Sequence, residues 1–361
     1  MTSLPPLHGL YTPLVTPFTA AGGIAVDALE GLAHAALDGG ATGIVALGTT
    51  GEPATLDAAE RRTVIETCAR VCAQRSAPLI VGAGSSDTRG SIAALAELAE
   101  WPQVSAVLVP VPYFSRPSEA GVIAHFTELA AASGLPVVIY HIPYRTGQSL
   151  GTQTLRRLLR LPGVVGVKYA TGSVDAEAVG VLGDLPADRA VLAGDDLFLA
   201  PLLALGAAGG ILASAQLHPA AFAALVAAWR TGDLPLARRL GPPLAELAAA
   251  VFAEPNPTVI KGVLAAQGRI PTAAVRLPLL PASATAVRTA LARLAALPAV
   301  APTEAAPAGP ADRAGTTGPA APLGPPAPAR PAPEAAPTET APPRADGPAG
   351  AHAAHPAATT P

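Results

Sequence analysis

The chain has 361 residues, half of them hydrophobic, so it is long enough to bury a sizeable core. Its formal net charge of -3 offers no basic surface for nucleic acid, and we expect no nucleic-acid partner. Two cysteines, Cys68 and Cys72, are too few for a disulfide framework or a structural zinc site. The first residues lack the basic and apolar regions of a signal peptide, which predicts a cytoplasmic protein.

One apolar run, at 197–215, is long enough to suggest a membrane span. It contains Pro201 and the glycine-rich break 206–210, which favour a buried helix, a turn and a buried strand instead. We therefore expect no membrane partner.

A repeating pattern of short apolar runs, each followed by an alanine-rich helical segment, extends from residue 9 to about 215. Strands are expected at 10–15, 43–47, 79–81, 106–109, 137–140, 164–168, 190–192 and 210–212. Apolar strands that alternate with helices indicate a parallel sheet covered by helices, and eight such units predict an α/β fold, the (β/α)8 TIM barrel. An open doubly wound sheet is the alternative, but it needs a G-x-G-x-x-G fingerprint after an early strand, and none occurs there.

The expected helix ends agree with this register. Asp57 and Glu60 are spaced as a capping box, and Ser118 and Ser173 stand where further helices should begin. Gly39-Gly40 and Gly134 follow helical segments, as C-cap residues do.

Four helical segments are expected after the eighth strand, near 219–230, 234–252, 257–267 and 282–297. The first can close the barrel, and the others form an appended layer. Beyond Pro298 the chain is rich in alanine and proline, with too few large apolar residues to offset the entropy of ordering. The predicted organisation is a barrel at 1–231, a C-terminal helical layer at 232–297 and a disordered tail at 298–361.

The segment 164–172, with the sequence VVGVKYATG, places Lys168 at the end of a buried strand. The chain has only two lysines, Lys168 and Lys261, so arginine serves wherever a generic positive charge suffices. Only an amine can lose its proton and attack a carbonyl, and an apolar environment disfavours the charged ammonium. The alternative is a lysine that merely extends its charged end to solvent from a strand end.

Three neighbouring strand ends make the chemical interpretation stronger. Gly48-Thr49-Thr50-Gly51 follows the second strand, Tyr140 ends the fifth and Lys168 ends the sixth. In a barrel these ends meet at one face, where the amine can attack a 2-oxo acid, hydroxyls can relay protons and the turn can hold a carboxylate. Taken singly, the turn could be structural and Tyr140 a core residue.

Four motifs resemble the dihydrodipicolinate synthase / N-acetylneuraminate lyase family. They are Gly48-Thr49-Thr50-Gly51-Glu52, Tyr140-x-x-Pro143-x-Arg145-Thr146-Gly147, Gly166-Val167-Lys168-x-Ala170-Thr171-Gly172 and Glu254-Pro255-Asn256-Pro257, within a match over 8–297. The resemblance implies a class I barrel that forms a Schiff base between Lys168 and pyruvate, without cofactor or metal. It also implies a homotetramer or homodimer.

The resemblance also implies residue roles. Tyr140 would be the proton-transfer phenol and Thr49 its relay partner, while Thr50, with Gly48 in the same turn, would bind the pyruvate carboxylate. Ile211 would lie against the bound pyruvate.

Arg145 marks a subgroup, because in the synthases of the family this arginine holds the carboxylate of aspartate-4-semialdehyde. The expected function is condensation of pyruvate with that aldehyde to 4-hydroxy-tetrahydrodipicolinate, in lysine and diaminopimelate biosynthesis.

Three departures from the family pattern leave the second substrate open. Phe114 stands where the synthases have a relay tyrosine, Tyr169 where an acidic residue is usual, and His141 where asparagine is usual. The alternatives are a class I aldolase or dehydratase for a sugar-derived 2-oxo acid, and a non-catalytic paralogue that binds a 2-oxo acid. A metal-dependent aldolase that uses Asp195 or Asp196 is a further alternative.

Many synthases of the family bind lysine at a subunit interface. The corresponding positions here are Ala58, Arg61, Ser86 and Gly90, with Tyr113 retained. Gly90 lacks the carboxylate that pairs with the ligand's ammonium, and Arg61 adds a like charge, so we expect an enzyme that lysine does not inhibit.

Overall fold

The computed structural model describes residues 7–300. Residues 1–6 and 301–361 lie outside the described part, and so does nearly all of the tail predicted at 298–361. The proposed division of the chain at residues 231 and 297 stays a prediction.

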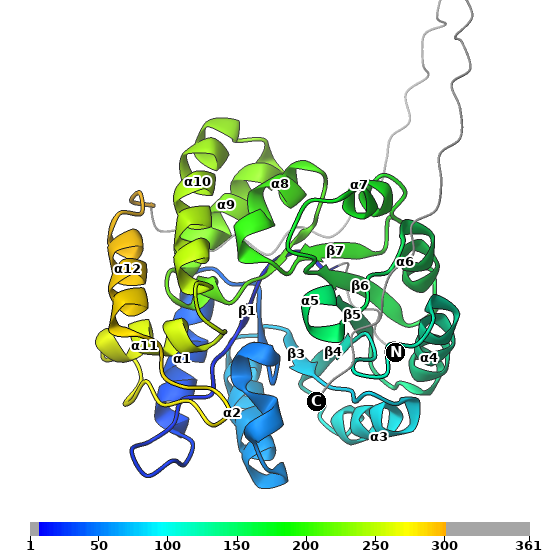
Figure 1. Cartoon of the computed structure of the whole chain (residues 1–361), viewed down its shortest axis with the longest axis horizontal. Coiled ribbons are helices and arrows are strands. Elements are labelled where there is room, and N and C mark those ends of the chain that lie inside the picture. Colours follow the sequence, from blue (N-terminus) through cyan, green and yellow to red (C-terminus); the bar gives the residue numbers. More distant parts are fainter. Residues whose placement is uncertain (1–6, 301–361) are drawn as a thin grey trace, which may run out of the picture. The chain divides into compact units, whose positions relative to one another are not determined.

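Eight parallel strands close into a barrel, each paired with the next along the chain and β8 with β1 (Figure 1). They are β1 (Gly9–Pro13), β2 (Gly43–Ala46), β3 (Leu79–Gly82), β4 (Val104–Pro110), β5 (Val137–His141), β6 (Val164–Tyr169), β7 (Ala190–Ala193) and β8 (Gly209–Ile211). The (β/α)8 barrel and all eight expected strands are confirmed, with ends that differ by up to two residues.

The helices around the barrel begin and end largely where the caps predicted. They are α1 (Val26–Asp38), α2 (Ala58–Gln74), α3 (Thr88–Ala99), α4 (Glu119–Ala132), α5 (Pro143–Thr146), α6 (Thr152–Leu159), α7 (Ala176–Leu182), α8 (Leu199–Ala204) and α9 (Pro219–Thr231). The capping box of Asp57 and Glu60 is present. At α7 the predicted start at Ser173 is wrong, because the Asp175 side chain accepts the bond from the helix.

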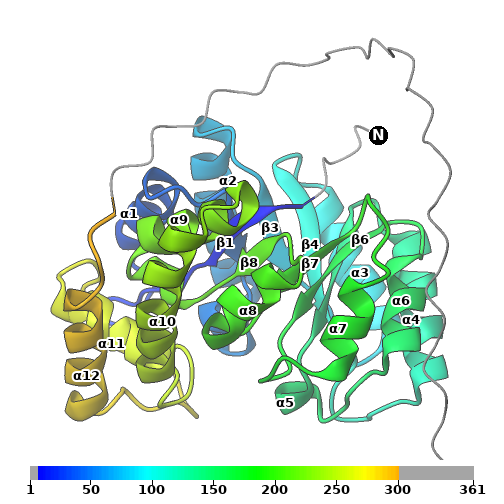
Figure 2. The same cartoon turned by 90° about the horizontal axis from the view of Figure 1, so that it is seen from above.

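Three further helices follow the barrel, as expected: α10 (Leu234–Val251), α11 (Thr258–Ala266) and α12 (Ala284–Ala295). Figures 1 and 2 place α12 beside α10 and α11 beside α12, on the outside of the barrel. Within the described residues, no helix is long and apolar enough to cross a membrane.

Side chains of successive strand residues point alternately into the barrel and outward to the helices. The inner cluster includes Tyr11, Val45, Ile80 and Tyr140, whereas Tyr169 belongs to the outer cluster under the helices. This alternation decides which of the strand-end residues can face a site inside the barrel mouth.

Candidate active site

Lys168 and Tyr140 lie side by side at the ends of neighbouring strands. Lys168 of β6 is the register partner of Tyr140 of β5, so both side chains point into the barrel. The Lys168 Nζ lies 4.2 Å from the centre of the Tyr140 ring. Both residues are buried, at 6% and 7% exposed, so an amine and a phenol share a largely dehydrated space.

A glycine on the next strand end leaves room for the lysine. A Cβ at Gly194, just after β7, would lie 2.8 Å from Lys168 Cγ and 3.0 Å from its Cε. Any larger residue there would push the lysine aside. Ile211 of β8 is fully buried and lines the same space.

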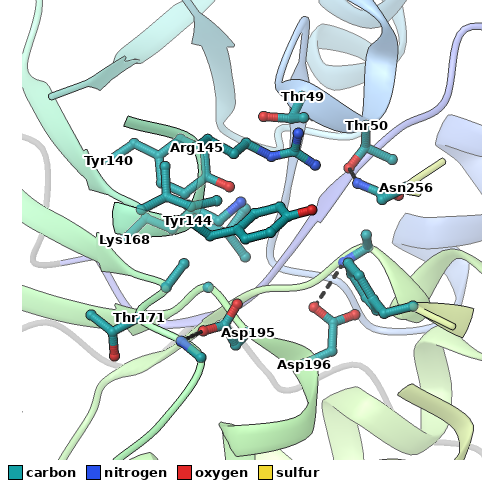
Figure 3. A pocket seen from close by; sticks show the side chains of 17 residues that line it. Thr49, Thr50, Tyr140, Tyr144, Arg145, Lys168, Thr171, Asp195, Asp196 and Asn256 are labelled. Carbon is teal, nitrogen blue, oxygen red and sulfur yellow. Dashed lines mark hydrogen bonds between the residues drawn. The ribbon is translucent and has the colours of Figure 1, made fainter. Parts of the chain in front are cut away.

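These side chains line a cavity of about 290 Å³ at the carboxyl ends of the strands. It is lined by Thr49, Thr50, Tyr140, Ile142, Tyr144, Arg145, Lys168, Ala170, Thr171, Gly172, Gly194, Asp195, Asp196, Ile211, Ala213, Phe252 and Asn256 (Figure 3). The structure thus brings together six of the predicted site residues. Gly48 does not line the cavity; it precedes the 3-10 turn Thr49–Gly51 and its carbonyl accepts a bond from Gly51 N–H.

The buried hydroxyl of Thr50 has a defined partner. The amide Nδ2 of Asn256 donates to Thr50 Oγ1 at 3.0 Å, so the hydroxyl hydrogen of Thr50 is free to point into the cavity (Figure 3). The turn itself is held by Thr16, three residues after the end of β1, whose hydroxyl donates to the Gly51 carbonyl at 2.7 Å. Asn256 belongs to the motif 254–257, but the sequence alone predicts no role for it.

The second lysine has a structural partner instead. Lys261 Nζ lies 2.6 Å from Glu52 Oε1, and both side chains are buried away from the cavity. Burial lowers the pKa of Lys261, while the carboxylate of Glu52 opposes that shift. Lys168 is therefore the lysine that lines the cavity.

The rim of the cavity carries Arg145 and Tyr144, both from α5. The Arg145 guanidinium lies 5.7 Å from the centre of the Tyr144 ring, and Figure 3 shows that ring across the cavity between Arg145 and Asp195. Sequence reasoning missed Tyr144, although it lies within the motif 140–147. Its position directly before Arg145, the residue that marks the subgroup, could have indicated that Tyr144 lines the site.

Two acidic residues that follow β7 line the cavity and bind backbone groups. Asp195 Oδ2 accepts from Gly172 N–H at 2.6 Å, and the Asp196 carboxylate accepts from the N–H groups of Ala213 and Ser214. Burial raises the pKa of both carboxyls, that of Asp196 to about 6. Among residues 7–300, no group of three or more histidine, cysteine, aspartate or glutamate side chains could hold a metal ion.

The three departures from the family pattern lie elsewhere. Phe114 follows β4, is 94% exposed and does not line the cavity. Tyr169 and His141 point outward from β6 and β5, opposite to Lys168 and Tyr140, and line a second cavity. None of the three can contact a substrate bound at Lys168 within this chain.

Together, the fold and the cavity define a (β/α)8 barrel with a candidate active site at the carboxyl ends of the strands. A family model described as the dihydrodipicolinate synthetase family matches residues 6–296, so the chain belongs to that family and is a lyase.

The matched segments cover nearly the whole length of the relatives. The 4-hydroxy-tetrahydrodipicolinate synthase of Sorangium cellulosum is 41% identical over 282 residues, which cover 77% of this chain and 91% of that protein. The synthase of the same name from Neisseria gonorrhoeae is 38% identical over 275 residues, which cover 76% of this chain and 93% of that protein. The crystal structure of dihydrodipicolinate synthase from Acinetobacter baumannii complexed with pyruvate matches this chain with a TM-score of 0.76 and 34% sequence identity. The match covers 80% of this chain and 99% of that one.

Proposed function

We propose that this chain condenses pyruvate with aspartate-4-semialdehyde to 4-hydroxy-tetrahydrodipicolinate. The observation that carries the proposal is the pairing of Lys168 with Tyr140, in one cavity with Thr50 and Arg145. A cavity of about 290 Å³ suits two small substrates.

Lys168 is proposed to attack the keto carbon of pyruvate and, with loss of water, to form an imine. The carbon next to the imine then loses a proton, and the resulting enamine attacks the aldehyde. The amino group of the aldehyde substrate next attacks the imine carbon, which closes the ring and releases the amine of Lys168. The free hydroxyl hydrogen of Thr50 supports a role in holding the pyruvate carboxylate, next to which Ile211 supplies an apolar wall. No cofactor is required in this scheme, because the electron sink is the imine of Lys168.

Proton transfer is assigned to Tyr140, with Thr49 as its relay partner. The Tyr140 phenol lies beside the amine and within the buried part of the cavity, where it can give a proton to the departing water. Thr49 lines the same cavity, and its side chain carries a hydroxyl.

Arg145 is proposed to bind the carboxylate of the second substrate. A guanidinium matches a carboxylate in two parallel hydrogen bonds, and Arg145 stands at the rim, where a substrate enters after pyruvate is bound. A site with Arg145 at its rim should prefer a short aldehyde that has its own carboxylate over a long sugar-derived 2-oxo acid.

We further propose a homotetramer that works in the cytoplasm. The exposed Phe114, held at φ 68°, is a large apolar side chain that contact with a second copy would bury. Cys68 and Cys72 are free and buried, as in a reducing compartment. Sedimentation velocity tests the oligomer: a chain that stays monomeric at micromolar concentration contradicts it.

The function is tested by steady-state assays with pyruvate and aspartate-4-semialdehyde, against a panel of sugar-derived 2-oxo acids under the same conditions. Turnover is expected only with the former pair. Cleavage of a sugar acid with a kcat/KM comparable to that for aspartate-4-semialdehyde would overturn the assignment. The absence of turnover with every substrate tested would overturn it too.

A further inference from the structure

Closure of the product ring requires the removal of a proton that none of the residues assigned so far accepts. The amino group of aspartate-4-semialdehyde is protonated at neutral pH, and an ammonium has no electron pair with which to attack the imine carbon. Tyr140 and Thr49 are assigned to the departing water, while Thr50 and Arg145 are assigned to the two carboxylates. The amino group of the second substrate therefore still needs an anionic partner and a base.

Among the described residues, the carboxylates that line the cavity are those of Asp195 and Asp196. Both oxygens of Asp196 are occupied, because Oδ1 accepts from Ala213 N–H at 3.3 Å and Oδ2 accepts from Ser214 N–H at 2.5 Å. The residue is only 4% exposed. Asp196 therefore ties the segment after β7 to the segment after β8 and has no oxygen left for a substrate.

Asp195 has one oxygen bound and one open. Its Oδ2 accepts from Gly172 N–H at 2.6 Å, and no group within residues 7–300 donates to its Oδ1. Oδ1 is not among the polar atoms that are sealed from solvent without a partner, so it is accessible from the cavity that Asp195 lines. Burial raises the pKa of the Asp195 carboxyl, which makes this carboxylate a stronger base than an exposed one.

Asp195 lies near the lysine that forms the imine and opposite the arginine at the rim. It directly follows Gly194, which packs against the Lys168 side chain, and the charge of Lys168 acts on the Asp195 carboxyl. Figure 3 shows Arg145 and Asp195 on opposite sides of the cavity. In the aldehyde substrate one carbon carries both the amino group and the carboxylate, so an anion and a cation that face one cavity match both groups.

On the basis of the function proposed above, we propose that Asp195 binds the ammonium group of the second substrate through Oδ1 and is the base for ring closure. Asp195 removes a proton, and the electron pair of the amine forms a bond to the carbon of the protonated imine, whose π pair moves to the Lys168 nitrogen. The bond from that carbon to Lys168 then breaks as the ring nitrogen forms its own double bond. The ring nitrogen loses two protons and the Lys168 nitrogen gains two, each carried by Asp195 in turn, so protons and charge balance.

Asp195→Asn tests this role with little change of shape. The new amide oxygen can still accept from Gly172 N–H, but the amide nitrogen in place of Oδ1 can neither bind an ammonium nor accept a proton. We expect kcat/KM for aspartate-4-semialdehyde to fall roughly 100-fold, while trapping of pyruvate by borohydride is unchanged. Asp188→Asn, on the exposed segment before β7, is the matched control and should leave kcat/KM unchanged.

An aldehyde without an amino group separates this role from a structural one. The probe is 4-oxobutanoate, which keeps the aldehyde and the carboxylate of the second substrate. Its inhibition constant against aspartate-4-semialdehyde should be the same for the wild type and Asp195→Asn. Because ring closure is slow in the variant, borohydride added during turnover should trap the condensed but unclosed adduct on the protein, which intact-protein mass spectrometry distinguishes from the lighter pyruvoyl adduct.

A kcat/KM of Asp195→Asn equal to that of the wild type would overturn the proposal. It would also be overturned if the variant lost affinity for 4-oxobutanoate to the same extent, or if borohydride trapped only the pyruvoyl adduct in the variant. Failure of the wild type itself to turn over pyruvate and aspartate-4-semialdehyde is a different result, which would overturn the proposed function and this role with it.

Discussion

Lys261 Nζ lies 2.6 Å from Glu52 Oε1, and this ion pair joins α11 to the turn that carries Thr49 and Thr50. The two side chains are 0% and 2% exposed. Glu52 stands in the left-handed region at φ 54°, directly after the turn, and its Oε2 accepts from Arg276 N–H at 3.0 Å. The pair therefore holds the end of the substrate-binding turn in a backbone conformation that is costly on its own.

Lys261→Met should reduce the free energy of unfolding by about 3–5 kcal/mol, because it leaves the Glu52 carboxylate buried without its ion-pair partner. Urea unfolding monitored by circular dichroism measures the loss. The double variant Lys261→Met with Glu52→Leu should recover part of that stability, since it removes both charges. A loss below about 1 kcal/mol for the single variant would show that the pair contributes little.

Lys168 should carry the imine. Incubation with pyruvate and borohydride is expected to add a reduced pyruvoyl mass to the peptide that contains Lys168, and Lys168→Ala should abolish the adduct. Lys261→Arg is the control, because it keeps a cation opposite Glu52 and should leave the adduct unchanged. An adduct found on Lys261 instead would contradict the assignment.

Arg145→Lys should lower kcat/KM for aspartate-4-semialdehyde roughly 30- to 150-fold, the equivalent of about 2–3 kcal/mol for a charge-assisted contact. Trapping of pyruvate by borohydride should be unaffected, because Arg145 is placed at the rim. The exposed Arg157→Lys, on α6, is the matched control. An equal loss for both substrates would argue against a specific role in binding the aldehyde.

Lysine should not inhibit the enzyme at sub-millimolar concentration. A Cβ at Gly90 would lie 2.8 Å from both Asp87 Oδ2 and Ser85 Oγ, so no side chain fits there without rearrangement. The nearby Asp87 carboxylate already caps α3 by accepting from Gly90 N–H at 2.8 Å. Titration of lysine into the steady-state assay measures the response, and half-inhibition below 1 mM, a threshold of roughly -4 kcal/mol in binding free energy, contradicts this expectation.

Acid should destabilise the fold partly through His141. Burial depresses its pKa from 6.5 to about 4, so the unfolded chain binds this proton before the folded one does. The free energy of unfolding therefore does not depend on this group above pH 6.5. It decreases by up to about 3 kcal/mol as the pH falls from 6.5 toward 4. His141→Asn should flatten the fall in melting temperature between pH 7 and pH 4.5. Identical pH profiles for the variant and the wild type would rule out this contribution.

The amino-acid sequence by itself predicted the barrel and six of the residues that line the cavity at its mouth. Apolar runs at a regular spacing predict strands, and the capping box of Asp57 and Glu60 predicts a helix start, because both depend on neighbours within a few residues. Lys168 and Tyr140 were predicted to meet because parallel strands of a barrel end at one face. Even the error at Ser173 was small, since Asp175, two residues on, provides the same cap.

Only the tertiary structure decided which side chains contact and support these residues. The contacts of Asn256 with Thr50 and of Lys261 with Glu52 join positions 206 and 209 residues apart, which no local pattern encodes. Likewise, the outward direction of His141 and Tyr169, and the acidic cavity they line, follow from how α4, α6 and α7 pack on the barrel. Such contacts depend on the simultaneous fit of many side chains, and the packed structure alone supplies it.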